Sequence, residues 1–181
     1  MSTATIEFAS FEFDPKSCSI PSNTQNIIEI SCHEDLAQEP QWLPKILPFL
    51  EAVLKKLQLS GWELSVLFCK DDFIQELNKN YRQLDMPTDV LSFNSGSIYE
   101  DEVGVEWFSA GDIVISVDTL AKNAVEFNVS QDQELKRLLI HGILHLSGMD
   151  HSDNSPEQPM LQFQEIVLQD FIAESDIIIT K

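Results

Sequence analysis

Three of the chain's four histidines fall within one window of eleven residues, His141-Gly-Ile-Leu-His145-Leu-Ser-Gly148-Met-Asp-His151. The first two are four residues apart, so on a helix their imidazoles lie on the same face. Gly148 predicts the end of that helix, because glycine readily adopts the left-handed conformation that turns a chain. The turn can bring His151 back toward the first two rings. Three nitrogen ligands with no fourth protein ligand are typical of an open, catalytic metal site.

The same window matches the zincin pattern H-E-x-x-H-x-x-G-x-x-H at every position but one. Gly142 stands where that pattern has its glutamate. Glycine cannot act as the general base of peptide hydrolysis, so we expect a zincin-like metal-binding helix but not a peptidase. A purely structural zinc site is disfavoured, because such sites usually complete four protein ligands and favour cysteine.

The composition predicts one folded domain in a reducing compartment. The chain has 181 residues, of which 43% are hydrophobic, and no apolar run approaches the roughly 20 residues that span a bilayer. Its first residues lack the basic and apolar regions of a signal peptide. The odd number and scatter of Cys18, Cys32 and Cys69 predict reduced thiols. We therefore expect a cytoplasmic protein with no membrane partner, and we expect His33, the remaining histidine, on the surface.

Net charge limits the possible partners. Thirty acidic residues against eleven basic ones give a formal charge of −19, which repels nucleic acid at long range. An RNA substrate would need a local basic groove, and DNA is not expected to bind. An acidic surface also suits a basic protein partner.

Strand and helix patterns alternate along the chain, which predicts an α+β (α/β-like) single domain. We expect a small mixed sheet of about four strands covered by about five helices. Residues 1–25 are predicted to be an irregular extension, 26–173 the domain and 174–181 a tail. Strands are predicted at 26–31, 62–68, 89–93 and 111–116, and an acidic loop at 94–108. Helices are predicted from about 42 to near Gly61, from Asp72 to before Pro87, from 117 to about 127, from 131 to before Gly148, and from about 157 to 173.

Local signals predict several helix starts. The sequences Asp72-Phe-Ile-Gln75 and Ser130-Gln-Asp-Gln133 both resemble capping boxes. Ser116 is positioned to cap the helix that follows the last predicted strand. In the helix after Asp72, we expect a buried stripe of Phe73, Leu77 and Tyr81.

Three blocks of sequence together resemble the YbeY family of single-strand endoribonucleases, which are implicated in ribosomal RNA maturation. The blocks are Leu77-Asn-Lys-Asn-Tyr-Arg82 with Asp85-Met-Pro-Thr-Asp-Val-Leu-Ser-Phe93, then Gly111-Asp-Ile-Val-Ile-Ser116, then the histidine window. The family usually has Gly-Lys after the arginine, whereas this chain has Gln83-Leu84. A basic residue near the expected RNA groove is therefore missing.

The resemblance implies one metal ion per chain, most often taken to be zinc, held by His141, His145 and His151. Another divalent transition metal is possible. Zinc lowers the pKa of bound water toward about 7, which provides a nucleophile without a carboxylate base. The implied substrate is single-stranded ribosomal RNA, processed in association with the ribosome or a ribosomal protein. The implied roles are rRNA maturation and ribosome quality control.

Arg82 occupies the position of the family's functional arginine, and its guanidinium matches phosphate oxygens. The alternative is a surface ion pair with Asp85 or Asp89. Weaker candidates are Lys136 and Arg137, for a groove leading to the metal, and Asp112, for orienting a ligand histidine. Thr88, Asp89 and Ser92 are expected to form a cap and turn before the short strand rather than to take part in chemistry.

Two other functions stay open at this point. One is a metal hydrolase with a different substrate, which the acidic charge favours. The other is a non-catalytic ribosome-assembly factor whose metal stabilises the fold and whose acidic surface binds a ribosomal protein.

Overall fold

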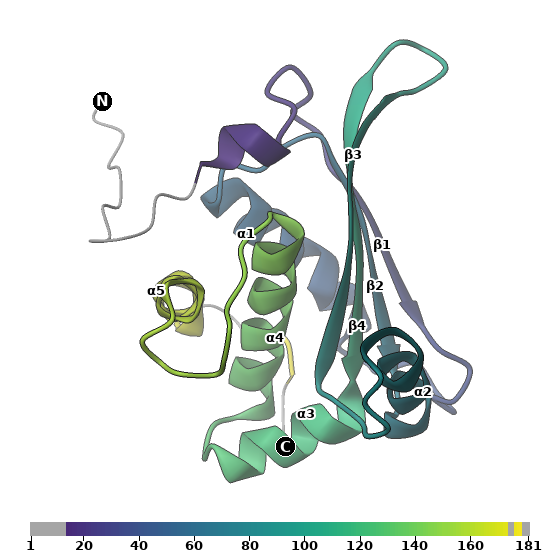
Figure 1. Cartoon of the computed structure of the whole chain (residues 1–181), viewed down its shortest axis with the longest axis vertical. Coiled ribbons are helices and arrows are strands. Elements are labelled where there is room, and N and C mark those ends of the chain that lie inside the picture. The colour runs from purple at the N-terminus through teal and green to yellow at the C-terminus, as the bar shows by residue number, and fades with distance from the viewer. Residues whose placement is uncertain (1–13, 174–175, 179–181) are drawn as a thin grey trace.

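The computed structural model describes residues 14–173 and 176–178. It contains a four-stranded mixed sheet of order β1-β2-β4-β3, in which β1, β2 and β4 are parallel and β3 is antiparallel to β4 (Figure 1). This arrangement confirms the predicted α+β domain. The elements are η1 (Pro15–Cys18), β1 (Ile27–Cys32), η2 (Leu43–Lys45), α1 (Ile46–Lys56), β2 (Trp62–Cys69), α2 (Asp71–Arg82), β3 (Val90–Glu100), β4 (Glu106–Ser116), α3 (Val117–Glu126), α4 (Gln131–Leu146) and α5 (Pro159–Ile172).

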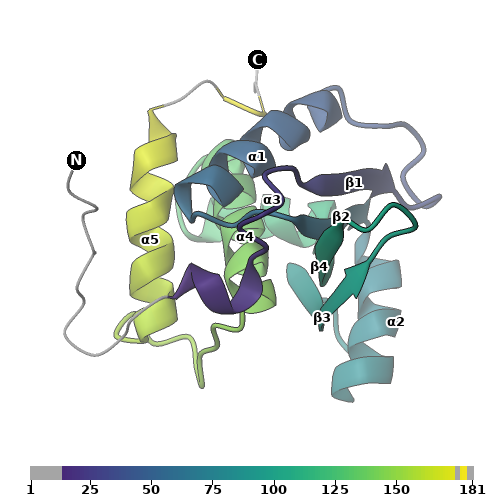
Figure 2. The same cartoon turned by 90° about the horizontal axis from the view of Figure 1, so that it is seen from above.

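The two faces of the sheet carry cores of different size. Side chains alternate across a strand, so Ile113 and Ile115 of β4 join the large core while Val114 joins a small cluster on the opposite face. The large core lies under α1, α4 and α5, with α4 between the sheet and α5 (Figure 2). Helix α2 covers the small cluster through Ile74. The histidine-bearing helix is therefore the most enclosed helix of the fold.

Gly142 allows α4 to approach the sheet closely. A Cβ atom added at this position would meet three side-chain atoms of Ile113 at 2.7–2.9 Å. Real Cβ contacts are not this short, so a larger residue would push the helix away from β4 or displace Ile113. Close packing of α4 against β4 therefore also requires glycine at position 142, where the zincin pattern has glutamate.

The acidic segment 94–108 is not the loop that we predicted from the sequence. β3 continues to Glu100 and pairs with β4, which begins at Glu106, so only 101–105 form a turn. The Asp101 carboxylate accepts hydrogen bonds from the backbone N–H groups of Val103 and Val105 and thereby stabilises this turn. The hairpin projects beyond the ends of β1 and β2 (Figure 1). The sequence of this part of β3 resembled a loop because its residues are exposed and polar. The strand is held by backbone pairing with β4 and not by burial of its side chains.

Two predictions about α2 were wrong. The helix begins at Asp71 rather than after an Asp72 cap, and the side chain of its N-cap residue, Lys70, makes no capping hydrogen bond. Asp71 instead accepts hydrogen bonds from Ser116 and Thr119 at the start of α3. Of the predicted stripe, Phe73 and Leu77 are partly buried and pack against the small cluster, whereas Tyr81 is 69% exposed. The fully buried residues of the helix are Ile74 and Asn78. The caps predicted at Ser116 and Ser130 are confirmed, since each side chain accepts a hydrogen bond from the backbone N–H three residues later.

The predicted N-terminal extension falls partly outside the described residues, which begin at residue 14. The described part is not irregular throughout, because it contains η1 and places Cys18 and Ile20 in the core. The indole N–H of Trp62 donates to the carbonyl of Cys18. At the other end, Ile177 is buried and its backbone N–H donates to the Asp132 carboxylate. The domain boundaries themselves stay a prediction.

Two further sequence expectations concern single residues and membrane segments. His33 is partly buried rather than simply on the surface, and its ring stacks on that of Phe73 with centroids 3.8 Å apart. Cys69 is buried within the fold, and burial raises the pKa of its thiol to about 12. Among the described residues, no helix has the length and apolar character needed to cross a membrane.

Candidate metal centre

The three histidines predicted as ligands lie together. One ring nitrogen from each of His141, His145 and His151 lies within 4.8 Å of the other two. His141 and His145 lie on α4, and their Nε2 atoms are 3.0 Å apart. The ring of His151 has its centroid 5.2 Å from that of His141 and 5.1 Å from that of His145. This is the convergence that a three-nitrogen metal site requires.

The turn after α4 brings His151 to the other two rings. Gly148 has a φ of +91°, a conformation that residues with a side chain rarely adopt. The backbone N–H of Gly148 donates to the carbonyl of His145, and that of Met149 donates to Leu144. These two bonds form a Schellman motif, which the glycine in the sequence predicted. Met149 is buried, so the turn is fixed to the core before the chain reaches His151.

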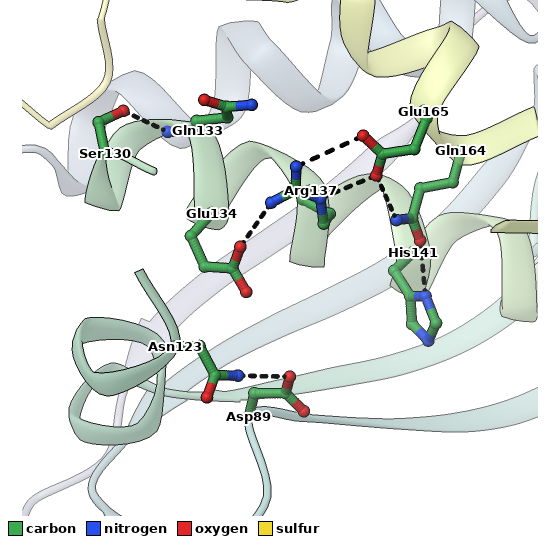
Figure 3. Close-up of polar contacts among 9 residues, drawn as sticks. All are labelled: Asp89, Asn123, Ser130, Gln133, Glu134, Arg137, His141, Gln164 and Glu165. Carbon is green, nitrogen blue, oxygen red and sulfur yellow. Dashed lines mark hydrogen bonds and ion pairs between the residues drawn. The ribbon is translucent and has the colours of Figure 1, made fainter. Parts of the chain in front are cut away.

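Each imidazole has a hydrogen-bond partner at Nδ1. His141 Nδ1 lies 2.7 Å from the side-chain oxygen of Gln164 on α5 (Figure 3). His145 Nδ1 lies 3.1 Å from the carbonyl oxygen of Met149, and His151 Nδ1 lies 2.9 Å from that of Asp153. Oxygen acceptors at Nδ1 hold the proton there and leave the Nε2 lone pair for a metal ion.

The surroundings of the two helical histidines favour the neutral form, which is the form that binds metal. Burial lowers the pKa of His141. Burial, together with the neighbouring His141 and His151 rings, lowers the pKa of His145 to about 4. Both rings are therefore uncharged at neutral pH without a metal ion being present.

The histidines line a pocket of about 630 Å³ between α4, α5 and the start of β3. Ser92 lines this pocket from β3, and its hydroxyl is shielded from solvent with no hydrogen-bond partner among the described residues. An unsatisfied buried polar group calls for an explanation. Together with three converging imidazole nitrogens, it fits a site that a metal ion and its bound group complete.

Arg82 lines the same pocket and makes no ion pair with any residue that the structure describes. The alternative of a surface ion pair is wrong for both partners considered. Asp85 pairs with Lys79 at 2.7 Å. Asp89 accepts hydrogen bonds from the Asn123 side chain and from the backbone N–H of Val90. The guanidinium is therefore available to a ligand of the pocket.

Two weaker predictions were wrong. Lys136 is 1% exposed and pairs with Asp132 at 2.9 Å, so it does not line a groove. Asp112 accepts a hydrogen bond from Ser65 on the opposite face of the sheet. Because Ile113 and Ile115 face α4, Asp112 must face away from the histidines. Arg137 does line the pocket, but Glu134 and Glu165 both pair with it.

The segment before β3 behaves largely as predicted. The Asp89 carboxylate accepts from Thr88 and from the backbone N–H of Val90, as a turn residue does. Ser92 differs, because it contributes a hydroxyl to the pocket and not to the turn.

Sequence reasoning missed Gln164 altogether. A signal was present, since Gln164 lies three residues after Leu161 and four before Leu168, within the apolar stripe of α5. A polar residue in such a stripe needs a buried partner. Here Gln164 is 5% exposed, and its partner is the imidazole of His141.

Comparison with known proteins gives consistent matches to one family. The family model described as endoribonuclease YbeY matches residues 27–172. An endoribonuclease YbeY from Treponema denticola is 63% identical over 123 residues, which are 68% of this chain and 79% of that protein. One from Treponema pallidum is 48% identical over 143 residues, which are 79% of this chain and 88% of that protein. The solution structure of a Thermotoga maritima protein is similar with a TM-score of 0.54 and 31% identity, covering 80% of this chain and 88% of that one.

Proposed function

The chain belongs to the endoribonuclease YbeY family, and we propose that it is a metal-dependent enzyme that cleaves single-stranded RNA during ribosomal RNA maturation and ribosome quality control. The proposal places the protein in the cytoplasm, with the ribosome or a ribosomal protein as its partner. The observation that carries it is the convergence of three imidazoles in one pocket with Arg82, which forms no ion pair with the residues that the structure describes.

Zinc is the metal that we propose, bound by His141, His145 and His151. Three neutral histidines with an open position are the ligand set of catalytic zinc sites, although they suit other divalent transition metals too. When bound, zinc supplies Lewis acidity, which activates water as a nucleophile at neutral pH. This chemistry needs no carboxylate at position 142, where the chain has glycine.

The protein's own groups provide the remaining functions that hydrolysis of a phosphodiester needs. Arg82 is proposed to bind the phosphate and to stabilise its charge in the transition state. Ser92 has a hydroxyl in the same pocket whose donor and acceptor capacity is unused among the described residues. We propose that it hydrogen-bonds the bound phosphate or the attacking water.

Binding of RNA cannot depend on a broad basic surface in this protein. The net charge is −19, and Arg137 in the pocket is already neutralised by Glu134 and Glu165. Phe127 also lines the pocket and is 57% exposed. Aromatic rings bind unpaired bases by stacking, so we propose that Phe127 stacks on a base while Arg82 binds a phosphate.

An RNA-cleavage assay tests the proposal. Purified protein, with its metal content measured by elemental analysis, is incubated with an unstructured RNA and with the same sequence held in a duplex. We expect cleavage of the unstructured RNA only, loss of cleavage with a chelator, and recovery when zinc is added back. Arg82→Glu should abolish cleavage while leaving the zinc content unchanged.

The double variant His141→Ala, His145→Ala is the control for a contaminating nuclease, because it should neither bind zinc nor cleave. Cleavage by this variant would contradict the proposal. So would a wild-type protein that binds zinc stoichiometrically and cleaves no single-stranded RNA, an outcome that would favour the assembly-factor alternative.

A further inference from the structure

The side-chain amide of Gln164 lies between two groups that together determine its orientation. Its oxygen is 2.7 Å from Nδ1 of His141, and its nitrogen donates to the Glu165 carboxylate at 3.0 Å (Figure 3). An amide can present either an acceptor or a donor to a neighbouring imidazole, depending on which way it is turned. A carboxylate only accepts, so an ionised Glu165 requires the amide nitrogen on its own side.

Glu165 is kept ionised by Arg137. The guanidinium donates to both carboxylate oxygens, at 2.8 Å and 3.4 Å. Burial alone would raise the pKa of Glu165, but the hydrogen bonds from Arg137 and Gln164 outweigh it and lower the pKa below its usual value. Arg137 is fixed in turn by Glu134, whose carboxylate lies 2.6 Å away and whose residue is 2% exposed.

We infer that Glu134, Arg137 and Glu165 are positioning residues that select the tautomer of His141 through the amide of Gln164. We call these four residues the orienting chain. With Glu165 accepting from the amide nitrogen, the amide oxygen faces His141, whose Nδ1 must then carry the proton. The lone pair is left on Nε2, the atom that faces His145. The inference rests on the proposed metal site and adds residues beyond its ligands.

The other two histidines explain why only His141 needs such a chain. His145 and His151 use main-chain carbonyl oxygens as partners, and a carbonyl can only accept. Their tautomers are therefore fixed by the backbone. Of the three partners, only the Gln164 amide could turn over and present its nitrogen to the ring. It is also the one that contacts a charged side chain, the carboxylate of Glu165.

The rival explanation is that Arg137 and Glu165 merely join α4 to α5. The variant Glu165→Gln distinguishes the two explanations. A glutamine can either accept a hydrogen bond from the Gln164 amide or donate one to it, so it no longer fixes the orientation of that amide. Asp170→Asn is the matched control. It makes the same change in an ion-paired carboxylate of the same helix, one that pairs with Lys56 at 2.6 Å.

Two measurements are made on each protein. The first is zinc affinity by competition with a chelator. The second is ¹⁵N NMR of the imidazoles in the metal-free protein, which reports the tautomer directly. We expect Glu165→Gln to weaken zinc binding by about tenfold to a hundredfold, as for other changes behind a ligand histidine. We also expect it to give His141 a mixture of tautomers, and Asp170→Asn to change neither.

A rescue keeps the test decisive if Glu165→Gln also loses stability. Adding Gln164→Glu in that background puts an acceptor-only group beside Nδ1, so it should restore the single tautomer and the zinc affinity without restoring the ion pair. Failure of this rescue would overturn the inference. A single tautomer and unchanged affinity in Glu165→Gln would do the same. Neither readout involves RNA, so an inactive wild-type protein would overturn the proposed function alone.

Discussion

The two histidines on α4 and the third in the following loop are held in different ways. His141 and His145 belong to a helix packed between the sheet and α5 (Figure 2). Within that helix, Gly142 lies against Ile113 of β4. His151 lies in a segment of turns and bends, and most hydrogen bonds of this segment join residues within it. There the Asp153 side chain accepts from the backbone N–H of Ser155 and from the Gln158 side chain.

Two of the proposed ligands therefore depend on the whole fold, and the third depends on local structure. Helix-borne ligands lose their geometry only when the core or the sheet changes. A loop-borne ligand can move while the core stays intact, because loops open at lower free energy than core elements. Changes near α4 are therefore expected to alter stability and metal binding together, and changes in the loop to alter metal binding alone.

The largest expected effect is loss of a ligand from the helix. His141→Ala should reduce zinc affinity by more than about a hundredfold, beyond the range typical of changes behind a ligand. His151→Ala should cost less, since the preformed pair on α4 is still present. Isothermal titration of zinc into both metal-free variants measures this difference. Equal losses would show that the loop is as well fixed as the helix.

Restoring the zincin glutamate should damage the fold. Gly142→Glu would place a side chain against Ile113, and we expect a loss of at least about 3 kcal/mol, from overpacking and a buried carboxylate together. Urea denaturation of the metal-free protein measures it. Gly142→Ala should lose less, about 1–3 kcal/mol, and Ile113→Ala should cost less in that background than in the wild-type protein, because it also removes the clash with the added methyl group. A stable Gly142→Glu protein would contradict the packing reason for this glycine.

Acid should destabilise the metal-free protein through the helical pair. The folded-state pKa of His145 is lowered to about 4 from 6.5. The stability that its neutral ring provides is therefore full above about pH 6.5 and is lost as the pH falls through about 4. The loss is at most about 3 kcal/mol. To measure this loss, the free energies of unfolding of wild type and His145→Asn are compared as a function of pH. The difference between them should change between about pH 6.5 and about pH 4. A difference that is constant with pH would refute it.

Replacing the glycine of the turn should have a moderate effect on both regions. Gly148→Ala leaves the space around the residue free but keeps a φ of +91° that alanine tolerates poorly. We expect a cost of about 1–2 kcal/mol in unfolding free energy and weaker zinc binding, because the turn also supplies the Met149 carbonyl to His145. Gly148→Asn should cost less, since asparagine visits this conformation more readily.

The smallest effect is expected within the loop. Asp153→Ala removes the bonds to Ser155 and Gln158 but keeps the backbone carbonyl that holds His151. Stability should change by less than about 0.5 kcal/mol, as for most surface substitutions, while zinc affinity falls by less than about tenfold. A loss of stability larger than that of Gly148→Ala would mean that the loop is part of the global fold.

The part of the site that sequence predicted is the part encoded locally. The spacing of His141 and His145, the glycine turn and the caps at Ser116 and Ser130 are each set by residues within a few positions of one another. Periodicity of apolar residues in the same way located the helices and most strands.

What sequence did not predict depends on contacts between distant segments. Gln164 and Ser92 reach the pocket from α5 and β3. The apolar stripe around Gln164 signals that its amide needs a buried partner, but no neighbouring residue in the chain shows that this partner is His141. The continuation of β3 through an acidic segment depends on pairing with β4. The predicted position of Asp112 was wrong because β4 carries apolar residues on both of its faces. The sequence therefore does not show which face of the strand α4 covers.

The position of Gln164 in the chain determines when the histidine site can be completed during synthesis. It comes 23 residues after His141, on the last helix of the described chain. A nascent or truncated polypeptide that stops before α5 would already possess all three imidazoles, yet without the amide beside the first of them. The centre can therefore be completed only after α5 has been synthesised, which is later than every strand of the described sheet.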